Sequence, residues 1–260
     1  MSKELVTKKS IAKDIVLITL NDPDSRNAMS EEMAKQFADT ISLLSLNSEL
    51  RAIFLIGSGP TFSSGGHLDM LMEKTKHSAL VNRHSMEIFY KSFLSLTELD
   101  VPVVAIINGH AMGAGLCLTL ACDFRVAVSS AKLGFNFVRI GLHPGMGATY
   151  FLPRLVGPSR AAELLYTGRV IGAEEAFSIG LINRVITENG IDEYVNETCQ
   201  YFINAGPLAT RELKRSLKLS PWLSLDQSLA QEAKAQAINF QSREFVEGLK
   251  AIKEKRPPKF

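Results

Sequence analysis

The sequence predicts an α/β protein whose sheet is largely parallel and covered on both faces. In the first two-thirds of the chain, short β-branched runs alternate with helix-like patterns, and from about Ala161 onward the pattern is mostly helical. Apolar strands that are joined through helices favour a buried parallel sheet. A length of 260 residues suits one large domain. We therefore expect an α/β core over residues 1–200 and a helical region over residues 201–260.

Four strands and two amphipathic helices account for most of the expected core. The strands are predicted at 15–20, 52–56, 103–107 and 124–128, where β-branched and apolar residues are dense. Ser30 is the expected N-cap of the first helix, because two glutamates follow it in the first turn. Apolar stripes over 33–44 and 86–96 mark the two helices. Residues 113–122 carry no charge and predict a buried helix, and Pro257-Pro258 ends the last helix.

Composition excludes several classes of function. The chain has 29 Lys and Arg against 27 Asp and Glu, a net charge of +2, which gives no general attraction to nucleic acid or to an anionic membrane. Its apolar runs fall short of the ~20 residues of a membrane span, and the charged N-terminus does not resemble a secretory signal. Three cysteines without a CxxC pair and five histidines without ligand spacing indicate a reducing, cytoplasmic compartment and no metal site.

Common catalytic and nucleotide-binding motifs are absent from the sequence. There is no GxGxxG after a strand, no GxxxxGK[ST], no HExxH and no GxSxG. These absences leave a Rossmann dinucleotide site, a P-loop, a zinc protease and an α/β-hydrolase without support.

Two glycine turns share one layout, because each follows a predicted strand and leads toward a helix. They are Thr61-Phe-Ser-Ser-Gly-Gly-His-Leu-Asp-Met70 and Asn108-Gly-His-Ala-Met-Gly-Ala-Gly115. Glycine lets a ligand approach the backbone, and the first N–H groups of a helix have no intrahelical partner. On adjacent strands, two such turns can aim two N–H donors at one developing oxyanion, for example the enolate of a thioester. The alternative is that both turns only pack helix against sheet.

The sequence resembles the crotonase superfamily, the enoyl-CoA hydratase/isomerase group, over nearly its whole length. The resemblance rests on the two turns above together with Asn21-Asp-Pro-Asp-Ser-Arg-Asn-Ala28, Cys122-Asp-Phe-Arg125, Gly141-Leu-His-Pro-Gly-Met-Gly147, Leu152-Pro-Arg-Leu-Val-Gly157, Leu165-Tyr-Thr-Gly168, Ala173-Glu-Glu-Ala-Phe-Ser-Ile-Gly-Leu-Ile-Asn183 and Glu254-Lys-Arg-Pro-Pro-Lys-Phe260. It implies a crotonase-like spiral of β-β-α units. It also implies a C-terminal helical region over 201–260 that forms homotrimers or homohexamers, and an acyl-CoA thioester as ligand, with no cofactor beyond the coenzyme A of the substrate.

The resemblance also implies roles for individual residues. It places the two oxyanion N–H groups on Ser64 and Ala114. Lys255 matches a lysine that in relatives reaches a CoA phosphate across a subunit contact. The full set expected to contact the thioester is Arg26, Asn27, Ala28, Phe62, Ser64, Gly65, Gly66, His67, Gly113, Ala114, Cys117, Phe137 and Lys255.

The chain departs from the hydratases it resembles at their acid and base. The two hydratase glutamates fall on Cys117 and Phe137, and the acid position of some isomerases falls on Gly145. Hydration needs a base for water and an acid for the α-carbon, each supplying about 10²–10⁴-fold. We therefore expect hydratase activity to be very low or absent.

Two other side chains are candidates for proton transfer, and the reaction itself stays open. Tyr90 lies at the level of a catalytic histidine in a dehalogenase relative, or else it packs beside Phe89 and Phe93. His143, beside the isomerase position, is the candidate titratable group near the thioester, or else it bonds its own loop. The leading hypothesis is an acyl-CoA-processing enzyme. The alternatives are a catalytically weak acyl-CoA-binding protein and a CoA-thioester hydrolase that uses Cys117.

Overall fold

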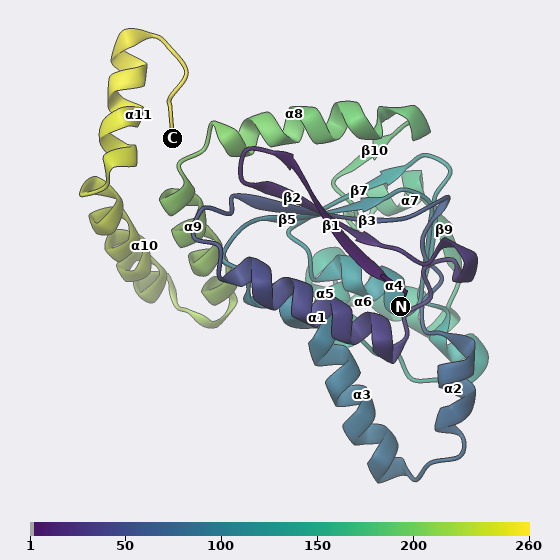
Figure 1. Ribbon diagram of the computed structural model, residues 1–260. Helices are drawn as coiled ribbons and strands as arrows, with labels where there is room; N and C mark the ends of the chain where they lie inside the picture. Colours follow the sequence, from purple (N-terminus) through teal and green to yellow (C-terminus); the bar gives the residue numbers. More distant parts are fainter. Residues whose placement is uncertain (1–2) are drawn as a thin grey trace.

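A six-stranded sheet forms the centre of the molecule, in a computed structural model that describes residues 3–260 (Figure 1). Its strand order is β1-β2-β3-β5-β7-β10, with β1 antiparallel to β2 and the other neighbours parallel. The strands are β1 (Val6–Ala12), β2 (Ile15–Leu20), β3 (Ala52–Gly57), β5 (Val103–Ile107), β7 (Phe124–Val128) and β10 (Arg184–Ile186). The four predicted strands are therefore confirmed. β1 was not predicted, because its exposed centre is polar, as is common for an edge strand.

A second, four-stranded sheet holds the continuation of three of these strands. It contains β4 (Thr61–Ser63), β6 (His110–Met112), β8 (Lys132–Gly134) and β9 (Val170–Gly172) in that order. β4, β6 and β8 come directly after β3, β5 and β7, and each pair of strands leads on to helical structure. The chain thus repeats a β-β-α unit, which confirms the crotonase-like spiral. The sequence did not show this sheet because three residues are too few for a periodic signal.

Eleven helices are present over the described residues. They are α1 (Glu31–Ser45), α2 (Leu68–Lys74), α3 (Ala79–Leu94), α4 (Ala114–Leu120), α5 (Ala148–Val156), α6 (Pro158–Thr167), α7 (Ala173–Ser178), α8 (Ile191–Ile203), α9 (Pro207–Leu219), α10 (Leu225–Phe240) and α11 (Arg243–Glu254). The predicted cap of α1 is confirmed, since Ser30 Oγ accepts the Met33 N–H at 3.1 Å. Every residue of α4 is buried, as its lack of charge predicted.

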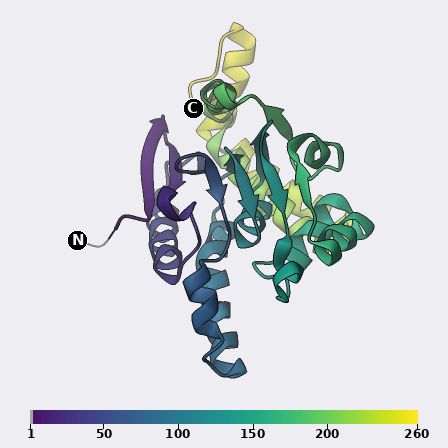
Figure 2. The ribbon, with the colours of Figure 1, turned by 90° about the vertical axis from the view of Figure 1, so that its right-hand side faces the viewer.

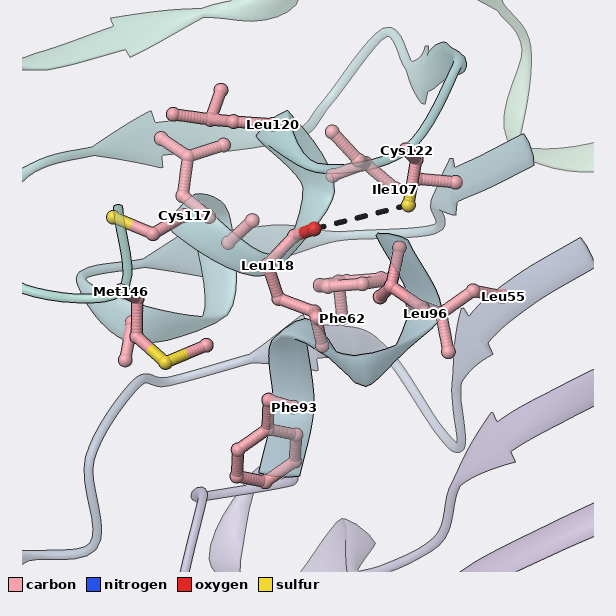
Figure 3. Close-up of a cluster of buried hydrophobic side chains, with 14 of the residues drawn as sticks. Leu55, Phe62, Phe93, Leu96, Ile107, Cys117, Leu118, Leu120, Cys122 and Met146 are labelled. Atoms are coloured by element: carbon pink, nitrogen blue, oxygen red, sulfur yellow. Dashed lines mark hydrogen bonds between the residues drawn. The ribbon is translucent and has the colours of Figure 1, made fainter. Parts of the chain in front are cut away.

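The large sheet buries both faces, so side chains alternate between two apolar clusters. On β5, Val104 and Ile106 belong to the cluster under α8, and Val103 belongs to the cluster shared with α1, α3 and α4. Figure 1 shows α8 on one side of the sheet and α1 and α4 on the other. Figure 3 shows part of the larger cluster, where Phe62 of β4 lies among residues of α3 and α4. The covered parallel sheet is confirmed.

The C-terminal helices divide into one that is fixed to the sheet and two that extend from it. On α9, Lys214 is 8% exposed, and its Nζ donates to Val101 O at 2.6 Å and to Asp123 Oδ2 at 2.8 Å. α11 lies at the end of the molecule opposite α3 (Figures 1 and 2), and α10 leads to it along one side of the molecule in Figure 1. Both helices expose many apolar side chains. The expected boundary between residues 200 and 201 lies inside α8. The trimerising role of this region stays a prediction.

Candidate active site

The two glycine turns meet at one edge of the second sheet. β4 and β6 are parallel neighbours, so the turns that follow them emerge side by side. Gly65 has φ +94°, and a Cβ on it would lie 2.8 Å from Met112 O and 3.5 Å from Ala114 N. Only glycine permits both this conformation and this approach. The turn after β4 therefore lies against the start of α4.

The turn that contains residues 26–28 lies along the first glycine turn. Ser63 Oγ donates to Asn27 O at 2.7 Å, and Ser64 N–H donates to Arg26 O at 3.0 Å. The Met29 N–H donates to Gly65 O at 2.7 Å. Two segments that the resemblance places at the CoA are thus brought together, although they are far apart in the sequence.

The hydrogen bonds of this turn decide which N–H group is available to a ligand. The Ser64 N–H is engaged by Arg26 O, which contradicts its prediction as an oxyanion donor. The N–H of Gly65 donates to Ser63 Oγ at 3.2 Å, and the N–H of His67 donates to Met29 O. Within the described chain, the Gly66 N–H has no hydrogen-bond acceptor. The available donor of this turn is therefore two residues beyond the predicted one.

The start of α4 supplies the second available donor. Ala114 is its first residue, and the first N–H groups of a helix have no intrahelical acceptor. Gly113, the N-cap, has φ +50° and turns the chain into the helix. Ala114 and Gly66, both of which the resemblance places at the ligand, line the same cavity.

This cavity has a volume of about 150 Å³ and is walled mainly by apolar side chains. The α2 and α3 wall consists of Leu68, Met70, Leu71, Met86 and Phe89. The opposite wall comes from the chain between β8 and α5 and consists of Phe137, Ile140, Leu142 and Met146. The polar side chains that line it are Ser64, Tyr90 and Asn136, and no charged residue of the described chain does so. A small apolar cavity with a few polar groups at one end is typical of a ligand site.

Tyr90 occupies the space that a side chain at position 145 would need. A Cβ on Gly145 would overlap Tyr90 Oη and would lie 2.8 Å from its Cζ. The ring also packs edge-on against Phe89, with centroids 6.2 Å apart, as the packing alternative expected for Phe89. A catalytic role of Tyr90 stays a prediction. Burial raises the pKa of the Tyr90 phenol, and the neighbouring Cys117 raises it further. The hydroxyl is therefore protonated at neutral pH and can donate a proton or a hydrogen bond.

None of the three expected carboxylate positions supplies a base. Phe137 lines the cavity, and Gly145 is backed by Tyr90. Cys117 is fully buried and does not line the cavity, which contradicts its expected contact with the ligand. Figure 3 shows its side chain in the core near Met146. Burial raises the pKa of the Cys117 thiol far above its usual range, so no thiolate forms at neutral pH.

Three further predictions are wrong. Phe62 is 0% exposed in the core, so it supports the turn and does not contact a ligand. Asn27 is also 0% exposed, and its side-chain amide donates to Ser58 O at 2.9 Å and to Thr61 O at 2.7 Å. His143 is exposed and lines a different cavity of about 570 Å³ beside α5 and α6. Its Nδ1 lies 2.7 Å from Pro144 O, as the loop-bonding alternative required.

Four other expected contact residues lie outside the cavity and stay predictions. Arg26 is exposed, and Ala28 is 7% exposed. His67 caps α2, with Nδ1 3.9 Å from Asp69 Oδ2. Lys255 is exposed at the end of α11, on the side of the molecule away from α3 (Figures 1 and 2).

Residues 3–260 contain neither a cluster of metal ligands nor a membrane-spanning helix. No group of three or more His, Cys, Asp or Glu side chains is placed to hold a metal ion. None of the helices there is long and apolar enough to cross a membrane.

Comparison with known proteins agrees with this architecture. The family described as enoyl-CoA hydratase/isomerase matches residues 10–260. The crotonyl-CoA hydratase of Syntrophomonas wolfei is 32% identical over 95% of this chain and 94% of its own length. The mitochondrial methylglutaconyl-CoA hydratase of Mus musculus is 34% identical over 95% of this chain and 80% of its own.

The solved structures agree with the sequence relatives. The enoyl-CoA hydratase from Bacillus anthracis superposes with a TM-score of 0.92 at 32% identity, over 98% of each chain. Fold and sequence thus agree with these relatives over nearly the whole length, and the chain belongs to the enoyl-CoA hydratase/isomerase family of the crotonase superfamily.

Proposed function

We propose that the protein binds an acyl-CoA thioester with the carbonyl oxygen between the N–H groups of Gly66 and Ala114. The observation that carries this proposal is that the two glycine turns touch and that Gly66 and Ala114 line one cavity. Preorganised backbone donors stabilise an oxyanion without reorganisation, and losing one typically costs about 10²–10³-fold in rate. The enolate of a thioester carries such an oxyanion.

The proposed reaction is an enolate reaction other than hydration. Activation of water needs a base, and the residues that line the cavity include no carboxylate, histidine or thiolate. Tyr90 is the group placed to give a proton to the enolate, since it lines the cavity and burial, which raises its pKa, keeps the phenol protonated. Decarboxylation forms the enolate by loss of CO2 and needs no base, so Tyr90 has only to protonate the α-carbon. Isomerisation and cleavage of a C–C bond also pass through an enolate, but each first needs a base to remove a proton.

In this proposal, the CoA phosphates are bound by a neighbouring subunit of the oligomer. Lys255 follows α11 and does not line the cavity of its own chain, so in a homotrimer or homohexamer it reaches the CoA phosphates of a neighbouring subunit. The apolar side chains exposed on α10 and α11, among them Leu229, Phe240 and Val246, fit such a subunit contact.

The test removes one N–H group without removing a side chain. Ala114→Pro deletes the donor at the first helical position, where proline is tolerated, and Ala114→Ser is the matched control that keeps it. We expect a conjugated enoyl-CoA to show a red-shifted absorbance when bound to the wild type and to Ala114→Ser, and to lose that shift with Ala114→Pro. An unchanged shift in Ala114→Pro refutes the oxyanion pair. Rapid loss of the enoyl absorbance by hydration refutes the assignment against hydratase chemistry.

A second candidate function is an acyl-CoA-binding protein with little catalysis. The lack of any carboxylate in the cavity favours it. Tight binding of a panel of thioesters, with neither conversion of the acyl group nor release of free thiol, would support it over the enzyme. Thiol release that disappears in Cys117→Ser would instead support a thioesterase, which the buried thiol argues against.

A further inference from the structure

We propose that the cavity selects acyl chains whose far end is uncharged and apolar, and rejects acyl chains that carry a carboxylate at that end. This inference rests on the proposed function, because it concerns the acyl part of the same bound thioester. Family membership leaves the acyl group open, whereas the walls of this cavity restrict it.

The walls of the cavity consist of apolar side chains, which pack against a hydrocarbon chain but offer no positive charge to a carboxylate. Leu71 and Met86 line one side, and Phe137, Leu142 and Met146 line the other. An ionised carboxylate that leaves water for such surroundings loses several kcal/mol unless a cation or several donors meet it. The same surfaces stabilise an alkyl chain by about 25 cal/mol for each Å² of apolar area removed from water.

The cations on neighbouring elements are directed elsewhere. Lys74 of α2 binds Glu31 Oε1 at 2.7 Å and also donates to Ser85, outside the cavity. Arg139, two residues from Phe137, donates to Thr167 O at 3.4 Å. Lys91, next to Tyr90 in the sequence, is exposed.

The polar groups of the cavity cannot replace a cation. Tyr90 offers one O–H, and Asn136 offers one amide. Both are neutral, and a single O–H leaves most acceptor sites of a carboxylate unpaired. Tyr90 is moreover the proposed proton donor at the reacting end of the ligand, so it is not available to the far end of the acyl chain.

Binding of a matched pair of thioesters tests the inference. Hexanoyl-CoA and adipoyl-CoA have the same chain length and differ in a terminal methyl group or carboxylate. By calorimetry with the wild type, we expect adipoyl-CoA to bind at least about 100-fold more weakly than hexanoyl-CoA. Equal affinities overturn the inference and leave the proposed function standing. If neither thioester binds more tightly than free CoA, the proposed function fails and the inference fails with it.

One variant tests the cause of the selectivity. Met86 lies one turn before Tyr90 on α3, and Met86→Lys places a cation in the wall at similar side-chain length. We expect this change to narrow the preference for hexanoyl-CoA by at least about tenfold, and the matched control Met86→Leu to leave it unchanged. An equal effect of both substitutions contradicts the electrostatic explanation. Circular dichroism shows whether each variant is folded, and the wild-type ratio decides the proposal even where a variant is not.

Discussion

The overlap between Tyr90 and position 145 predicts that Gly145→Ala changes the free energy of unfolding in opposite directions with and without the Tyr90 ring. Gly145 does not have a positive φ, so alanine there meets no backbone strain. If space allowed, Gly145→Ala would stabilise the protein by about 0.4–1 kcal/mol through the unfolded chain. The added methyl group instead overlaps Tyr90 Oη and approaches its Cζ at 2.8 Å. Overpacking of this kind costs about 1–3 kcal/mol. We expect Gly145→Ala to destabilise the wild type by about 1–2 kcal/mol.

Removing the ring should reverse the effect. In a Tyr90→Ala background, the three atoms that the new methyl group would meet are gone. Gly145→Ala should then stabilise by about 0.4–1 kcal/mol, which gives a coupling of about 2 kcal/mol between the two sites. Tyr90→Phe is the intermediate control, because it removes Oη and keeps Cζ.

Urea denaturation of the four proteins, at one fixed protein concentration, measures this cycle. A coupling near zero would mean that the phenol does not fill the space at position 145, and the assignment of Tyr90 to the reacting end of the cavity would fall with it. Thermal midpoints provide a second reading, at about 2–4 °C per kcal/mol for a chain of this size.

Three other results follow from local geometry. Gly65→Ala forces a side chain into φ +94° and against a backbone carbonyl, so it should lower the free energy of unfolding by about 2–4 kcal/mol in urea denaturation. Gly66→Ala, whose Cβ has room, should lower it by under about 1 kcal/mol, and similar losses in the two variants would contradict the turn geometry. Burial raises the pKa of the Cys122 thiol to about 12, so a disulfide reagent at pH 8 should label it only after unfolding, and fast labelling of the native protein would contradict that burial. Lys214→Met should lower the free energy of unfolding by about 1–3 kcal/mol, because the Asp123 carboxylate loses its cation but still reaches water. Lys218→Met, at an exposed position, should change it by less than about 0.5 kcal/mol, and equal effects of the two substitutions would contradict the buried contact.

The strands of the large sheet were predictable because they are continuous runs of apolar residues. The predicted strands at 15–20, 103–107 and 124–128 have the same bounds in the structure, since dense apolar residues are buried on both faces there. The second sheet could not be predicted in this way. Its strands have three residues each, and they pair only because the preceding strands of the large sheet lie next to one another.

The site was predictable in its location and not in its atoms. The glycine turns identified the edge at which the cavity lies, because glycine marks a close approach in the chain. Which N–H group remains available depends on Arg26 O and Ser63 Oγ. Arg26 lies 38 positions before Ser64, and Ser63 Oγ is itself oriented by Asn27 O, 36 positions before it. The exposure of His143 and the burial of Cys117 likewise follow from the path of the folded chain. An imidazole and a thiol suggested a titratable group and a reactive group at the ligand, but neither side chain lines the cavity.

The hydrogen bonds of Lys214 to Val101 O and Asp123 Oδ2 fix α9 to the residues that precede β5 and β7. The last two helices are tied to the rest of the molecule as well, because the Leu208 N–H of α9 donates to Glu244 Oε2 of α11 at 3.0 Å and Lys13 Nζ donates to Phe260 O at 2.6 Å. A subunit that docks on α10 and α11 would therefore meet a surface whose position is already set by the fold of the single chain.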